Sequence, residues 1–126
     1  MIAVKKLLLF ILFTFSSIVH AQWTSIGHSS DGNEFFVDYS TIQRVNMIVK
    51  VWTKVNLSED TLGILSSRNY QEYDCNEKKY RTLTRSTFKK LDLEQLLQTS
   101  SKPTEYIFIA PETVSLKILN IVCKSK

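Results

Sequence analysis

The chain contains two cysteines, Cys75 and Cys123, which lie 48 positions apart. In an oxidising compartment such a pair is typical of a structural disulfide, whereas in a reducing compartment it would favour a redox or metal pair. The destination of the protein therefore decides how strongly the two cysteines constrain the fold.

Residues 1–21 have the composition of a secretory signal peptide. Lys5 and Lys6 precede the apolar run LLLFILFTF, and the segment ends in Val19-His20-Ala21, which fits cleavage after Ala21. The apolar run is short for a membrane span, although an N-terminal membrane anchor is the alternative. We expect export and a mature domain of residues 22–126. The residue directly after the cleavage site is Gln22 and not a cysteine, so we expect no lipoprotein anchor.

Export favours a disulfide between Cys75 and Cys123. Closing a loop of this length stabilises a chain by roughly 4 kcal/mol in the chain-entropy model. A redox or metal pair is the alternative, but the chain has no C-x-x-C, and His28 is the only histidine after the cleavage site.

Removing Lys5 and Lys6 from the 16 basic residues leaves 14 against 12 acidic ones, a net charge of +2. A balance this mild does not by itself indicate a polyanionic partner. The expected mature length fits one domain with a modest core.

Most of the mature chain has strand character. Six runs predict strands: QWTSIGHSS and NEFFVDYSTI on either side of Asp31-Gly32, NMIVKVWTKVNL, two strands within residues 68–88 around a turn near Asn76-Glu77, and EYIFIA. In the third run Val49 and Val51 share an apolar face, and Lys50 and Lys54 share a polar one. Trp52 interrupts the polar face. Either a helix or a second subunit covers it, or it is half-exposed.

The remaining segments are predicted as connections and one helix. SEDTLGILSS is a polar connection, and KKLDLEQLLQTSSKP is a loop with one helical turn. TVSLKILNIVCK predicts a largely buried helix with Thr113 as its N-cap. The fold class is therefore α+β: an antiparallel β-sheet of about five to six strands with a C-terminal α-helix packed on it and one disulfide.

Residue patterns for catalysis are sparse. His28 lies beside Ser29-Ser30-Asp31-Gly32, which is typical of a turn, and the paired carboxylates such as Glu59-Asp60 are most simply solvated charges. We expect no enzyme activity, no metal and no cofactor.

One basic segment is the candidate for ligand binding. Its seven candidate ligand-binding residues are Lys78, Lys79, Tyr80, Arg81, Arg85, Lys89 and Lys90. Strand alternation would put Lys79, Arg81 and Arg85 on one face, suited to sulfated glycans, acidic protein segments or lipid phosphates. Export argues against nucleic acid. A charged edge strand that resists edge-to-edge pairing is the alternative.

Several short motifs in order resemble a known family. They are Trp23, FFVD (residues 35–38), Ile42, Arg44, VKVW (residues 49–52), EYDC (residues 72–75), Arg81, Leu83, Pro111-Glu112-Thr113-Val114 and Cys123. The pattern resembles the bacterial surface-adhesin protein E family of small exported Gram-negative domains, and it covers nearly all of the mature chain.

The resemblance implies a non-enzymatic adhesin-like domain that binds host extracellular-matrix or serum proteins such as laminin and vitronectin. It also implies a Cys75–Cys123 disulfide and a homodimer, whose contact would explain Trp52 on a polar face. The alternative function is a soluble periplasmic structural or accessory protein of the Gram-negative envelope. The expected location is accordingly periplasmic, or at the cell surface or secreted.

Overall fold

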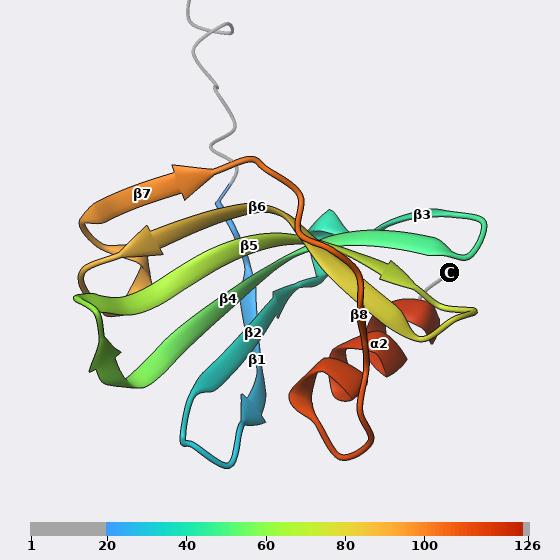
Figure 1. Cartoon of the computed structure of the whole chain (residues 1–126), viewed down its shortest axis with the longest axis horizontal. Helices are drawn as coiled ribbons and strands as arrows, with labels where there is room; N and C mark the ends of the chain where they lie inside the picture. The colour runs from blue at the N-terminus through green and yellow to red at the C-terminus, as the bar shows by residue number, and fades with distance from the viewer. Residues whose placement is uncertain (1–19, 125–126) are drawn as a thin grey trace, which may run out of the picture.

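The computed structural model describes residues 20–124 and contains one eight-stranded antiparallel sheet with a C-terminal helix on one face (Figure 1). The strands are β1 (Trp23–His28), β2 (Glu34–Asp38), β3 (Gln43–Val45), β4 (Ile48–Thr61), β5 (Ile64–Asp74), β6 (Lys79–Phe88), β7 (Leu96–Ser100) and β8 (Ile107–Phe108). The helix is α2 (Val114–Lys124), and two short 3-10 turns are η2 (Tyr39–Thr41) and η3 (Leu91–Leu93). Most of the expected signal peptide lies outside the described residues. Only its last two residues, His20 and Ala21, are described.

The main path of the sheet runs β1-β2-β4-β5-β6-β7. Two short strands lie off this path, because β3 pairs with the start of β4 and β8 pairs with the start of β6. The expected fold class is confirmed, with a strand count slightly higher than predicted.

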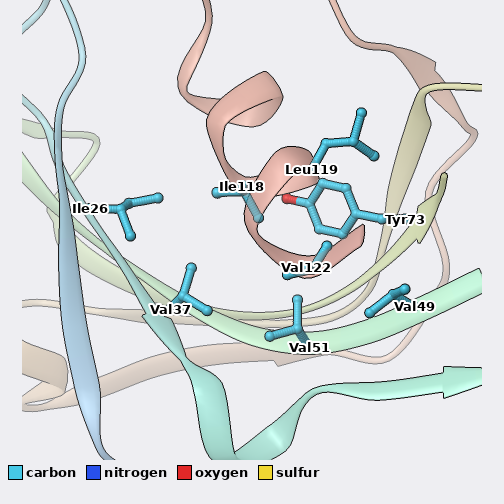
Figure 2. Packing of buried hydrophobic residues seen from close by; sticks show 8 residues of the cluster. All are labelled: Ile26, Val37, Val49, Val51, Tyr73, Ile118, Leu119 and Val122. Carbon is cyan, nitrogen blue, oxygen red and sulfur yellow. The ribbon is translucent and has the colours of Figure 1, made fainter. Parts of the chain in front are cut away.

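The hydrophobic core lies between the sheet and α2 (Figure 2). Alternation along β4 directs Val49 and Val51 into it, and Tyr73 of β5 lies opposite Val49 in the register. From the helix, Ile118, Leu119 and Val122 complete the contact. The other face of the sheet therefore carries Lys50, Trp52 and Lys54.

The predicted connection at residues 58–67 is instead a tight hairpin. Strand β4 runs to Thr61 and β5 begins at Ile64, so only Leu62 and Gly63 lie between them. Both have positive φ, at 54° and 79°, which suits a two-residue hairpin turn. The carboxylate of Asp60 accepts a hydrogen bond from the Gly63 amide at 2.7 Å. Local turn chemistry thus overrides the polar composition.

The predicted loop with a helical turn also differs. Its second half is β7, which pairs with the end of β6, and Leu96 lies opposite Phe88. Leu93, Leu96 and Leu97 are spaced as on one face of a helix, which is why the sequence indicated a helical turn. They form no buried helix face, since all five residues of β7 are exposed. Pairing with β6 decides the conformation.

The helix and the disulfide follow the prediction. Thr113 caps α2, because its hydroxyl accepts a hydrogen bond from the Leu116 amide at 3.2 Å. Near the other end of α2, Cys123 is bonded to Cys75, directly after β5, with a Cα–Cα distance of 5.7 Å. The disulfide therefore ties the end of the helix to the sheet.

Candidate functional site

The basic segment of residues 78–90 occupies the β5–β6 hairpin, β6 and the turn after it. Its strand contains a bulge: Tyr70 pairs with Thr84 and Gln71 with Thr82, which leaves Leu83 as the extra residue. A bulge changes the side-chain alternation beyond it. Arg81 therefore shares the face of its partner Glu72, opposite α2, whereas Arg85 shares the α2 side with Asn69. The prediction that Lys79, Arg81 and Arg85 share a face is wrong.

Lys79 and Arg81 lie at the hairpin end of β6, each beside a carboxylate. Arg81 Nε donates to Glu72 Oε1 at 3.0 Å, and Lys79 Nζ is 2.8 Å from Glu77 Oε2. The hydrogen bond with Glu77 raises the pKa of Lys79. Glu72 is buried, so its pairing with Arg81 compensates for much of the cost of removing that carboxylate from water.

Tyr106 joins these charges from the segment before β8. Its ring lies 4.7 Å from Lys79 Nζ and 4.8 Å from Arg81 Cζ, within the range of cation–π contact. Its hydroxyl donates a hydrogen bond to Glu72. This hydrogen bond, more than partial burial, raises the pKa of Tyr106.

Phe108 extends the same surface. It is paired with Lys79 in the register of β8 and β6 and is 74% exposed. Lys78 is exposed in the adjoining turn, where Asp74 accepts hydrogen bonds from three backbone amides. We call the set Lys78, Lys79, Arg81, Tyr106 and Phe108 the hairpin-end surface. It combines positive charge with exposed aromatic area.

The structure does not gather all seven predicted ligand residues. Tyr80 faces the helix side, where its ring stacks on Tyr73 with centroids 5.5 Å apart. Arg85 is exposed, but on that same side, past the bulge. Lys89 and Lys90 follow the far end of β6, roughly 30 Å from Lys79 at about 3.3 Å per strand residue.

Sequence reasoning missed Tyr106 and Phe108. The run EYIFIA correctly indicated a strand, but its apolar composition suggested burial rather than exposure. Only the pairing of β8 with Lys79 and Tyr80 shows that Phe108 borders the basic residues.

The face of Trp52 carries a second feature. Trp52 is half-buried: its ring lies 4.9 Å from that of Tyr70, and the guanidinium of Arg68 lies 5.4 Å from it. Within residues 20–124 no helix covers this face, because α2 packs on the opposite one. A covering helix is therefore not the explanation for Trp52 in this part of the chain. In the isolated chain Trp52 is half-exposed.

Lys54 anchors the neighbouring part of that face. Its ammonium is 4.0 Å from the Phe36 ring centroid and 3.1 Å from Asp92 Oδ1. Asn56 also donates to Asp92, and this bond, followed by that of Lys54, lowers the pKa of Asp92. Because Asp92 is 68% exposed, water screens the ion pair and its net stabilisation is small.

A pocket of about 410 Å³ opens beside Trp52. Trp23, Asp38 and Arg68 contribute to its wall, together with His20 and Ala21 from the N-terminal segment. The carboxylate of Asp38 is buried there, with 3% exposure.

Among residues 20–124, no group of three or more metal-binding side chains could hold an ion. In the same part of the chain, no helix is both long and apolar enough to cross a membrane.

Comparison with known proteins identifies the family. Residues 23–124 match the family described as Surface-adhesin protein E. The chain therefore belongs to the surface-adhesin protein E family, as its motifs indicated. None of the curated proteins matches it.

The fold is that of protein E from Haemophilus influenzae. One crystal form of that protein superimposes with a TM-score of 0.63 at 16% identity, covering 86% of this chain and 91% of the other. A selenomethionine form gives 0.61 at 15%, covering 86% and 90%. At this identity the likeness establishes the fold alone.

Proposed function

We propose that this protein is an exported, non-enzymatic adhesin-like domain that binds a host matrix or serum protein, such as laminin or vitronectin, through its hairpin-end surface. Membership of a surface-adhesin family supports the general role. The observation that carries the assignment of the surface is Phe108, a large apolar side chain left 74% exposed beside Lys79.

The chemistry of this surface suits a protein partner better than a polyanion. Glu77 and Glu72 already pair with Lys79 and Arg81, which leaves little unopposed positive charge. Strong polyanion binding needs several unpaired cations. Aromatic and arginine side chains surrounded by polar groups are instead enriched at protein–protein interfaces.

Substituting both Lys78 and Phe108 should weaken binding of the host protein without unfolding the domain. The Lys78→Glu/Phe108→Ala protein is expected to bind immobilised laminin or vitronectin at least tenfold more weakly, because truncating one interface anchor costs about 2 kcal/mol or more. Biosensor titration at two salt concentrations measures the loss. Both side chains are exposed, so the thermal midpoint should stay within a few degrees of that of the wild type.

The matched control is Lys89→Glu/Leu62→Ala. It makes the same change of charge and removes a comparably exposed apolar side chain, since Leu62 is 96% exposed. These two residues lie away from the hairpin-end surface, so affinity should be unchanged. Equal weakening by both pairs would show that net charge, not this surface, governs binding.

We place the proposed homodimer contact on the face of Trp52. A second copy would cover the half-buried Trp52 and Tyr70 rings, which no described helix covers. Sedimentation should show a dimer for the wild type and a monomer for the Trp52→Ala protein. A dimer in both, or a monomer in both, would refute this contact.

A further inference from the structure

The carboxylate of Asp38 is buried without a cationic partner in the described chain. Asp38 ends β2 with 3% exposure, and no ion pair to it forms within residues 20–124. Its Oδ1 accepts hydrogen bonds from the amide and hydroxyl of Ser40. A buried carboxylate normally requires a positive charge as well as hydrogen bonds, because desolvation strongly disfavours the bare ion.

The other carboxylate oxygen points to the backbone nitrogen of Gln22. Gln22 N donates to Asp38 Oδ2 at 3.3 Å. The register of the sheet fixes this approach, because Trp23, the next residue, pairs with Asp38. In the unprocessed chain this nitrogen is a neutral amide.

Processing after Ala21 would turn this nitrogen into the terminal ammonium. We propose that Asp38 is the docking site for the mature amino terminus, so that cleavage creates a partly buried ion pair between the Gln22 ammonium and Asp38 Oδ2. The inference rests on the proposed export. It assigns Asp38 a role in closing the edge strand β1 onto the sheet.

The same cleavage alters the pocket beside Trp52. His20 and Ala21 form part of its wall, whereas Trp23, Asp38 and Arg68 stay with the mature domain. Their removal widens the pocket and leaves the docked ammonium at its edge. Processing thus changes both the charge balance and the shape of this face.

A double-mutant cycle tests the docking. Two forms of the protein, beginning at Gln22 and at His20, are each made with and without Asp38→Asn. The form beginning at Gln22 should melt about 5 °C higher than the form beginning at His20, because an ammonium replaces an amide as donor to a carboxylate. In the Asp38→Asn background this gap should disappear. A gap of the same size in both backgrounds, or no gap in the wild type, would overturn the proposal.

The rate at which Gln22 cyclises tests whether its terminal amine is docked. A terminal glutamine cyclises when its free amine attacks the side-chain amide carbon, which forms a lactam C–N bond and releases ammonia. A protonated, docked amine lacks the free electron pair for this step. Folded wild-type protein should therefore cyclise at least tenfold more slowly than the same protein in urea. Equal rates would overturn the docking, even if Asp38→Asn protein failed to fold.

Sequencing the amino terminus of protein recovered from producing cells tests processing separately from docking. A start at Gln22 with no stability gap would refute docking and leave export intact. A start at another residue would refute the processing site and remove the ammonium from Asp38.

Discussion

Removing the disulfide is expected to destabilise the domain more than almost any single change. In the Cys75→Ala/Cys123→Ala protein, the free energy of unfolding should fall by about 4 kcal/mol, because the unfolded chain regains the entropy of a 48-residue separation. For a domain of this size the thermal midpoint should drop by roughly 15–25 °C. Calorimetry of the double variant against the oxidised wild type measures the shift.

Other contacts hold α2 on the sheet when the disulfide is lost. Arg44 Nη1 donates to the carbonyl oxygen of Cys123 at 2.7 Å, and the Cys75 amide donates to Met47 at 2.8 Å. These contacts and the core around Val122 should keep α2 on the sheet at low temperature. Chemical reduction of the wild type is the control and should give a similar shift. If the thermal midpoint fell by only about 2–3 °C both in the double variant and in the reduced wild type, a stabilising role for the disulfide would be contradicted.

Tyr73 is the second position with a large expected effect. Among residues 20–124 it is the largest side chain that is completely buried, at 0% exposure between the sheet and α2. The Tyr73→Ala protein should lose about 3–5 kcal/mol of stability, because the cavity cannot collapse between two rigid layers. The Tyr73→Phe protein should lose only about 1 kcal/mol, the value of its hydrogen bond to Gln71. Urea denaturation of both variants distinguishes packing from hydrogen bonding.

Because Tyr73 is buried, we expect the stability of the domain to fall at alkaline pH. Burial, followed by the nearby Tyr80, raises the pKa of Tyr73 well above its usual value near 10. The folded state therefore holds the phenolic proton more tightly than the unfolded state. Stability from this group is complete below pH 10 and is lost as the pH rises from there through the raised pKa. The Tyr73→Phe protein should lose less stability than the wild type over this range, and an equal loss would assign the effect to other groups.

The sequence predicted the elements whose periodicity is strong. Val49 and Val51 alternate with Lys50 and Trp52, and this alternation places the core on one face of the sheet, as the structure confirms. Thr113 and the apolar spacing after it predicted α2. In these segments local preference and tertiary packing favour the same conformation.

Elements fixed by pairing could not be predicted. The exposed strand β7 has no buried face to leave a pattern, and it forms because β6 offers a free edge. The bulge at Leu83 depends on the register between β5 and β6, which no local motif records. It is this bulge that separates Arg85 from Arg81.

The candidate site was therefore only partly visible in the sequence. Lys79 and Arg81 were singled out from the charge run, and their role in binding stays a prediction. Their aromatic neighbours Tyr106 and Phe108 lie more than 20 positions away in the chain. Long-range strand pairing brings them together. Asp38 belonged to the quoted FFVD motif, yet its burial beside Gln22 appears only in the folded structure.

The central claim, that the hairpin-end surface binds a host protein at the outside of the cell, is tested most directly by ligand capture on intact producing cells. Labelled laminin and vitronectin are added to cells that make the wild type, the Lys78→Glu/Phe108→Ala protein or the Lys89→Glu/Leu62→Ala control at matched levels. We expect capture by the wild type and the control, and its loss in the first variant. Equal capture by cells that lack the protein, or detection of the domain by antibody only after the outer membrane is opened, would contradict the claim.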